Sequence, residues 1–497
     1  MFSIGGDGHG VYIMLPLIKY SLTMNDIWDA GVQNDKFALI SKMNKNCNIA
    51  VKTPVGTTKR FELEEIEMQG TKLSNIKCAV QMDTLGKECY MNNEGMYLYK
   101  ECVSVPPLGM IDDLVSFSEC GPETVKVNAL INAKIESKKL KFGPKKCFKI
   151  HIGSSNRECL TQKVHSADIN EAEYETYLGD IVSSDGSNDR NIANRYNKGV
   201  GAISQMDTML NRTSLGHFYF EIGLVMRDTM LVSKLVYNSE VWYNGSLDQL
   251  SKLEKIDEMW LRKLFSLAKS APKEGLYMEC GKMPIRFVVM MRRILYLWNI
   301  LHRDEDELVN RFLSAQQIWT SKKDWIQQVK KNMKEININL TDNQIMALSY
   351  ETFKKQIKIK MEIHAAKHLK RLQDSHTKTR NLVMKGFIPA DYLASPDLTK
   401  EQVQVLYKLR NEMIDVKMNF GSFYKNNKWC RTCYLFPETQ EHLLQCSGII
   451  HKLKEIDFSN LKYKMIFEPA NQVMITRAFS TILKTRTIII EESRKSP

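Results

Sequence analysis

Four residues near the C-terminal end constrain the fold of this 497-residue chain more than any other feature: Cys430, Cys433, His442 and Cys446. The spacing Cys-x2-Cys-x8-His-x3-Cys gathers three thiolates and one imidazole, a ligand set typical of tetrahedral Zn²⁺ sites. A Cys-x2-Cys pair suits a single turn that clasps the ion. The alternative is four unrelated buried residues. We favour a small zinc-binding module.

The residues around this cluster point to a ligand. Trp429 and Tyr434 would offer aromatic faces for stacking, and Lys428 and Arg431 would contact phosphates. This combination is typical of proteins that bind single-stranded nucleic acid. A purely structural zinc clip is the alternative.

The charge of the chain is also consistent with a polyanionic partner. There are 70 Lys and Arg against 57 Asp and Glu, a net charge of +13, and residues 353–385 alone hold ten bases and two acids. In that segment Ile357, Met361, Ala365 and Leu369 recur every four residues, which predicts a helix with one packed face and one basic face. The alternative is an ordinary solvated helix face.

No apolar run reaches the roughly 18 residues that a membrane span needs. The N-terminus has no basic residue ahead of its short apolar stretch and no small-residue cleavage pattern, so we expect no secretory signal and reduced cysteines. We therefore expect an intracellular protein, with the nucleus favoured over the cytoplasm. The glycine-rich stretch Gly5–Gly10 lacks the Lys and Ser/Thr of a phosphate loop and is predicted to be a flexible leader.

The hydrophobic pattern changes near residue 190. Up to residue 185, short β-branched or aromatic runs alternate with Gly and Pro turns, which predicts an α+β region. From about Asn191 the period is helical, and a stripe is formed by Leu253, Ile256, Trp260, Leu264 and Leu267. Such a stripe is typical of a helix packed in a core.

Two adjacent carboxylates, Asp112 and Asp113, lie between apolar runs. This arrangement predicts a β-turn-β hairpin that lifts both acids out of a sheet. Acids placed in this way suit Mg²⁺, which prefers hard oxygen ligands. An ordinary surface pair is the alternative.

Residues 48–179 resemble the later part of the palm of non-LTR (LINE-type) retrotransposon reverse transcriptases, motif by motif and in the family's order. The matching stretches are Asn48–Gly56, the Gln69-Gly70 motif, the pair Asp112-Asp113, Leu140–Cys147 and Tyr177-Leu178-Gly179. The resemblance implies that Gln69 and Gly70 lie against the nucleotide and template. It also implies that Asp112 and Asp113 bind Mg²⁺, that Lys146 lies near the leaving pyrophosphate, and that Tyr177, Leu178 and Gly179 grip the primer end.

The resemblance extends beyond the palm. Tyr237–Trp242 and Pro284–Tyr296 are similar to the helical thumb of these elements, and the Cys/His cluster is similar to their C-terminal zinc knuckle. The expected fold is α+β, a partial right-hand polymerase. Its parts are a leader and remnant of fingers and palm (1–47), a partial palm (48–185), a helical thumb (190–310), a basic helical region (311–425), the knuckle (426–450) and a tail (451–497).

The front of the chain departs from the family. Its polymerases need a third carboxylate on a strand some sixty residues before the Gln-Gly motif, near residues 1–11 here. The sequence there offers only Asp7, flanked by glycines that disfavour a strand. We therefore expect a reverse transcriptase fragment, truncated at its N-terminus and inactive, whose family acts on an RNA template with a DNA primer or target DNA.

Two other interpretations stay open. The first is a non-catalytic RNA- or DNA-binding protein that uses the basic helices and the zinc knuckle. The second is a transposon relic that folds poorly because its palm sheet lacks a central strand. Mg²⁺ would be the polymerase cofactor and Zn²⁺ the knuckle cofactor.

Overall fold

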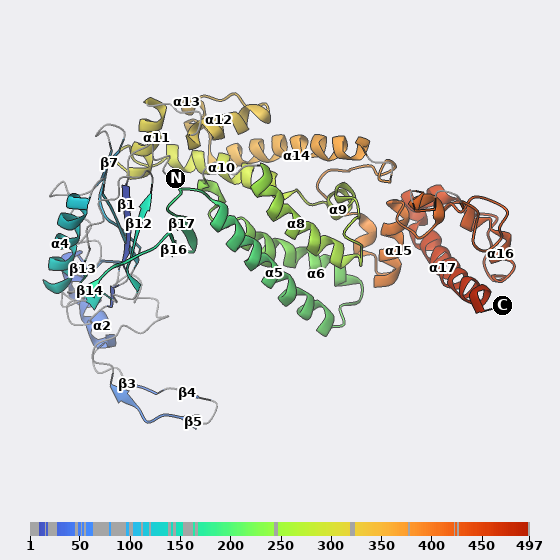
Figure 1. Ribbon diagram of the computed structural model, residues 1–497, viewed down its shortest axis with the longest axis horizontal. Helices are drawn as coiled ribbons and strands as arrows, with labels where there is room; N and C mark the ends of the chain where they lie inside the picture. Colours follow the sequence, from blue (N-terminus) through green and yellow to red (C-terminus); the bar gives the residue numbers. More distant parts are fainter. Residues whose placement is uncertain are drawn as a thin grey trace. The chain divides into compact units, whose positions relative to one another are not determined.

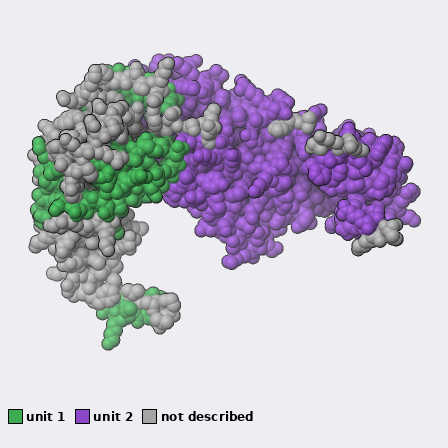
Figure 2. Space-filling view, viewed as in Figure 1, with its two compact units in different colours: residues 1–191, 242–244, 302–328 green, residues 192–241, 245–301, 329–497 purple. Residues whose placement is uncertain are grey.

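The chain forms two compact units in the computed structural model (Figures 1 and 2). Unit 1 comprises residues 1–191, 242–244 and 302–328, and unit 2 comprises residues 192–241, 245–301 and 329–497. The structure describes residues 9–14, 16–17, 27–44, 48–50, 52–53, 56–62, 79–80, 96–98, 103–110, 113–118, 121–137, 141–142, 146–152, 163–164, 167–242, 247–318, 324–375, 378–421, 423–424 and 427–495. Within these ranges no helix is both long and apolar enough to cross a membrane.

Unit 1 is built on a five-stranded sheet with the order β15-β12-β1-β10-β9. Its strand β1 pairs antiparallel with both β10 and β12, so that Met14 lies opposite Leu114 and Ile13 opposite Phe148. Helix α4 follows β10 and packs against it. The strands and helix are β1 (His9–Met14), β9 (Leu108–Met110), β10 (Asp113–Ser118), β12 (Phe148–Ile152), β15 (Asn170–Glu171) and α4 (Gly121–Ser137).

The predicted hairpin around the two carboxylates is confirmed by strands β9 and β10. They pair antiparallel, with Asp113 opposite Met110 and Val115 opposite Leu108. Val115 and Phe117 lie in a buried apolar cluster with Val103, Val105 and Ala315. The alternating positions Leu114, Ser116 and Ser118 are each 1% exposed, so both faces of β10 are buried. Residues 111 and 112, which connect the strands, lie outside the described residues.

The predicted flexible leader is wrong at its end, because His9 and Gly10 open strand β1. The poor strand propensity of glycine is overridden here by backbone pairing on both sides of the strand. Strand β1 is the middle strand of the five. The interpretation in which the sheet lacks a central strand is therefore not supported.

The other described strands of unit 1 form two-stranded pairs. They lie mainly where the short β-branched runs predicted an α+β region. The pairs are β2 (Pro16–Leu17) with β11 (Lys141–Phe142), β3 (Asn48–Ile49) with β6 (Phe61–Glu62), β4 (Lys52–Thr53) with β5 (Gly56–Thr57), β7 (Met96–Leu98) with β8 (Val103–Val105), β13 (Lys163–Val164) with β14 (Ala167–Asp168), and β16 (Tyr174–Tyr177) with β17 (Asp180–Ser183). Unit 1 also contains the helices α2 (Asn34–Asn44) and α11 (Leu308–Ile318).

Unit 2 is mostly helical, as the pattern after residue 191 predicts. Four members of the predicted stripe are confirmed, since Leu253, Ile256, Trp260 and Leu264 of α8 are each at most 1% exposed. The fifth, Leu267, lies beyond the end of this helix and is partly exposed. The α-helices and one π-helix are α5 (Asp189–Arg212), α6 (Tyr219–Met226), the π-helical η3 (Arg227–Val232), α7 (Ser233–Leu235), α8 (Leu247–Leu264), α9 (Lys273–Cys280), α10 (Ile285–Leu301), α12 (Trp325–Glu335), α13 (Asp342–Met346), α14 (Tyr350–Ser375), α15 (Lys400–Arg410), α16 (Ser447–Ile450) and α17 (Gln472–Lys495). Short 3₁₀ turns are η2 (Gly216–Phe218), η4 (Ser239–Val241), η5 (Asp391–Ala394), η6 (Lys417–Phe420), η7 (His442–Leu444), η8 (Tyr463–Phe467) and η9 (Pro469–Asn471).

The predicted basic helix is α14. Its line of apolar residues is buried, since Ile357, Met361, Ala365 and Leu369 are 0% exposed. Phe353 and Gln373 extend this buried line by one step at each end. The helix packs against α10 and α9, which leaves its lysines on the outer face.

The segment predicted as a tail contains the long helix α17 (Figure 1). Ile475, Phe479 and Ile482 on this helix are 0% exposed, and α17 packs against α15 and η8. The C-terminal helix is therefore part of the core of unit 2.

Candidate metal centre

The first half of the metal cluster is a tight turn, as the Cys-x2-Cys spacing predicts. The backbone N–H of Cys430 donates to the carbonyl oxygen of Phe436 at 2.7 Å, and the N–H of Tyr434 donates to the carbonyl of Cys430 at 3.0 Å. Tyr434 has a φ of +59°, which reverses the chain after Cys433. The turn therefore places Cys430 and Cys433 on the same side of the backbone.

The second half comes from two short helical turns. His442 opens η7, where its N–H donates to Thr439 Oγ1 at 2.9 Å. Cys446 precedes α16, and its carbonyl oxygen accepts the N–H groups of Ile449 and Ile450 at 3.0 and 2.9 Å. These backbone hydrogen bonds therefore give both ligands a defined local conformation.

The four ligand atoms converge, all within 4.8 Å of one another. The Sγ atoms of Cys430 and Cys446 are 3.7 Å apart, and Sγ of Cys433 lies 3.3 Å from Nε2 of His442. In a tetrahedral site with Zn–S bonds of about 2.3 Å, neighbouring sulfurs are separated by roughly 3.8 Å. The cluster can therefore hold Zn²⁺, and the interpretation as four unrelated residues is wrong.

A hydroxyl group supports the two buried thiols. Thr432 Oγ1 lies 3.1 Å from Sγ of Cys430 and 3.0 Å from Sγ of Cys446. Hydrogen bonds from Cys446, Thr432 and nearby backbone N–H groups lower the pKa of the Cys430 thiol, which favours the thiolate that a metal requires. Since all four positions would be filled by protein ligands, zinc here would be structural.

A glycine allows the two halves to close. A Cβ atom added at Gly448 would lie 2.7 Å from the carbonyl oxygen of Thr432 and 3.3 Å from the nitrogen of Cys433. Both contacts are with backbone atoms of the Cys-x2-Cys turn. The absence of a side chain at this position therefore lets α16 approach that turn.

Arg431 does not have the role that the sequence suggested. Its guanidinium group binds the buried carboxylate of Glu438, with Nη2–Oε2 at 2.8 Å, and also Asp415, with Nη1–Oδ2 at 3.2 Å. Burial would raise the pKa of Glu438, but Arg431 and Arg486 lower it below its usual value. Arg431 is thus committed to ion pairs within the module and does not offer a phosphate contact.

The aromatic side chains beside the cluster are exposed, as predicted for Trp429 and Tyr434. Trp429 is 54% exposed and Tyr434 is 67% exposed, and the exposed surface continues over Leu435 and Phe436. Lys428 is exposed beside them. The module thus presents apolar and aromatic surface together with one lysine.

The described residues of the predicted polymerase site lie at one edge of the sheet. Asp113 opens β10, and Lys146 lies two residues before β12. Strands β10 and β12 both pair antiparallel with β1, so their starting ends lie at the same edge, where β1 ends at Met14. Asp112, Gln69 and Gly70 lie outside the described residues.

The predicted primer-grip residues form a hairpin turn. Tyr177 ends β16, and Leu178 and Gly179 connect it to β17 with φ values of +48° and +83°, as in a type I′ turn. Burial and the charge of Asp113 raise the pKa of Tyr177 to about 12. Tyr177 also packs against the apolar cluster that contains Val115 and Phe117 of β10.

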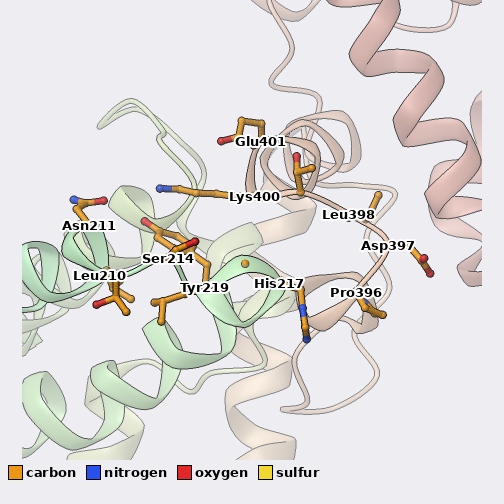
Figure 3. Close-up of a pocket in the computed structure, with 14 residues that line it drawn as sticks. Leu210, Asn211, Ser214, His217, Tyr219, Pro396, Asp397, Leu398, Lys400 and Glu401 are labelled. Carbon is orange, nitrogen blue, oxygen red and sulfur yellow. The ribbon is translucent and has the colours of Figure 1, made fainter.

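A pocket of about 570 Å³ lies elsewhere in unit 2, between the end of α5, η2 and the start of α15 (Figure 3). The side chain of Lys400 extends into it, with Nζ 3.9 Å from the centre of the Tyr219 ring. Its lining includes no metal ligand of the cluster. Sequence reasoning did not single out this pocket.

Comparison with known proteins does not assign the chain to a family. No protein-family model matches the chain, and no curated protein matches it significantly. Of the sites expected from the sequence, the structure brings together the Cys3His cluster, which could bind zinc.

Proposed function

We propose that this chain is a fragment of a non-LTR retrotransposon reverse transcriptase that binds nucleic acid and does not polymerise it. The observation that carries the proposal is the edge of the sheet in unit 1, where the starting ends of β10 and β12 and the end of β1 meet. Asp113 opens β10 there, and Tyr177 packs against the apolar cluster that contains Val115 and Phe117 of the same strand. A carboxylate beside the predicted primer-grip hairpin is what the resemblance implies.

The proposed lack of polymerisation follows from the ligands at this edge. Two-metal transfer requires enough carboxylates to hold both ions beside the primer 3′-hydroxyl and the leaving oxygen. Strand β1, which lies next to β10, has the sequence His-Gly-Val-Tyr-Ile-Met and contains no acid. Asp112 and Asp113 alone do not fit a site for two Mg²⁺ ions.

The proposed binding of nucleic acid rests first on α14. Lys354, Lys358 and Lys370 form ion pairs with acids on the same helix. Among the described residues no ion pair engages Lys360, Lys367 and Arg371. These three bases are exposed, and their charges can neutralise phosphates.

The zinc module would supply the second contact. Trp429, Tyr434 and Phe436 are exposed aromatic rings on which unpaired bases can stack, and Lys428 is the neighbouring cation. The proposed partners are an RNA template and a DNA primer or target DNA. A partner of this kind favours the nucleus over the cytoplasm as the site of action.

Binding can be tested by fluorescence anisotropy with single-stranded RNA and DNA at several salt concentrations. The triple variant Lys360→Gln, Lys367→Gln, Arg371→Gln should bind more weakly, with a salt slope reduced by roughly 2 if all three contact phosphates of a single strand. The matched control replaces Lys354, Lys358 and Lys370, which removes the same charge. Equal losses in both variants would show a diffuse charge effect and contradict a site on this face.

Catalysis can be tested by primer extension on an RNA template with Mg²⁺. We expect no incorporation by the chain as it stands. Incorporation that disappears in the double variant Asp112→Ala, Asp113→Ala would show an active polymerase. The alternative, a non-catalytic RNA- or DNA-binding protein that uses the basic helices and the zinc module, predicts no incorporation by either form. It also predicts that the double variant keeps its nucleic-acid affinity, because the variant changes neither α14 nor the zinc module.

A further inference from the structure

The metal module contains a buried carboxylate. Glu438 is 0% exposed and lies between the ligands Cys433 and His442 in the sequence. Its oxygens accept hydrogen bonds from Arg431, from Arg486 and from the backbone N–H of Lys417, the last at 3.0 Å. Every one of these donors comes from a different segment of unit 2.

The two arginines connect the metal-binding turn to the C-terminal helix. Arg431 lies inside the Cys-x2-Cys turn, whereas Arg486 lies on α17, and its Nη2 is 2.9 Å from Oε1 of Glu438. Both guanidinium groups also donate to the carbonyl oxygen of Asp415, at 2.8 Å from Arg431 and 2.6 Å from Arg486. Asp415 and Glu438 therefore form one acceptor site that both arginines share.

Arg486 depends on this acceptor site. The residue is 4% exposed, and a buried guanidinium without an acidic partner is strongly unfavourable. The part of α17 before Arg486 is held by the buried side chains of Ile475, Phe479 and Ile482. From Ile488 onward the helix is largely exposed, so the ion pair is the main buried anchor of its C-terminal half.

We propose that metal binding and the docking of α17 are coupled through Glu438 and Arg486. Zinc fixes the chain on both sides of Glu438 and holds Arg431 in the turn, and Glu438 then positions Arg486. When the metal leaves, residues 430–446 loosen, the acceptor site opens, and the C-terminal half of α17 separates from the module. Glu438 and Arg486 are thus positioning residues for the metal site.

Hydrogen exchange measured by mass spectrometry on the full chain tests this coupling. Removal of zinc by a chelator should accelerate exchange in residues 483–495 as well as in 428–446, and should leave 353–370 of α14 unchanged. In Arg486→Gln the segment 483–495 should exchange faster even with zinc bound. By reciprocity of coupled equilibria, zinc affinity should fall in this variant, by about tenfold as for other outer-shell partners of metal sites.

Arg477→Gln is the matched control, because Arg477 is exposed on the same helix and donates to the carbonyl of Asp397 outside the network. It should leave zinc affinity unchanged. Arg486→Lys keeps the charge but cannot reach both acceptors in the same way, so it should give an intermediate loss and guards against general unfolding. The coupling is refuted if the purified chain holds no zinc, if chelation leaves residues 483–495 unaffected, or if Arg486→Gln and Arg477→Gln bind zinc equally.

Discussion

Replacement of Gly448 by alanine should open the metal centre without removing any ligand. The new Cβ would lie 2.7 Å from the carbonyl oxygen and 2.9 Å from the carbonyl carbon of Thr432. Both atoms belong to the backbone, so the Cys-x2-Cys turn and α16 must move apart by several tenths of an ångström. Metal–ligand distances tolerate only about 0.2 Å, and Cys446 lies two residues before Gly448.

The size of the effect follows from the cost of overpacking. Such a substitution typically costs about 1–3 kcal/mol, which corresponds to a loss of roughly 5- to 150-fold in zinc affinity. Alanine is the better helix former, so a gain of up to about 1 kcal/mol in helix propensity opposes this loss. Because the cost of overpacking is larger than the gain in helix propensity, zinc affinity should fall by roughly tenfold.

The assay is a zinc titration in competition with a chromophoric chelator, with the absorption of the Co²⁺-substituted chain as a report on ligand geometry. Gly421→Ala is the control in the same unit, because a Cβ there would meet nothing closer than a carbonyl oxygen at 3.9 Å. If Gly448→Ala binds zinc within about twofold of the unmodified chain, a difference below about 0.5 kcal/mol, the argument from close backbone approach fails. An equal loss in Gly421→Ala would likewise contradict it.

Three other predictions concern stability. Ile357→Ala should lower the free energy of unfolding of unit 2 by about 2–4 kcal/mol because it creates a cavity, whereas Ile359→Ala, at a position 48% exposed, should change the denaturation midpoint little. Burial and Arg286 lower the pKa of His368 below 6.5, so the unfolded chain binds more protons than the folded chain near pH 6, and the free energy of unfolding should fall as the pH drops below 6.5. Urea denaturation at pH 7 and pH 5.5 measures this fall. The fall should be smaller in His368→Gln and unchanged in the exposed control His451→Gln. Chelation of zinc should lower the temperature at which calorimetry detects unfolding of unit 2, and stoichiometric zinc should restore it.

Much of the local structure could be predicted because it depends on residues close together in the sequence. The buried line from Ile357 to Leu369 follows from helical period, the β9–β10 hairpin from apolar runs on either side of a polar turn, and the metal cluster from ligand spacing. The hairpin at Leu178-Gly179 was also predicted, although the packing of Tyr177 against the cluster of Val115 and Phe117 was not.

What could not be predicted depends on partners that are distant in the sequence. Strand β1 is stabilised by pairing with β10 and β12, more than a hundred residues away, so local propensity at Gly10 was misleading. Arg431 looked available for phosphate, but its partners Asp415 and Glu438, and the neighbouring Arg486, meet only in the folded chain. Helix α17 was expected to be a tail, although its buried residues Ile475, Phe479 and Ile482 recur at helical spacing.

The buried residues of α14 recur every four positions, and this spacing restricts insertions and deletions in the helix. Positions four apart on a helix advance by about 40° around its axis, so the buried line from Phe353 to Gln373 winds through roughly 200°. Trp298 of α10 lies against Tyr350 at one end of this line, and Phe287 lies against His368 further along. Deleting one residue midway would rotate everything beyond it by about 100° and expose half of the line to water. Substitution of the exposed lysines would leave the packing of α14 intact, whereas the loss or gain of one residue would not.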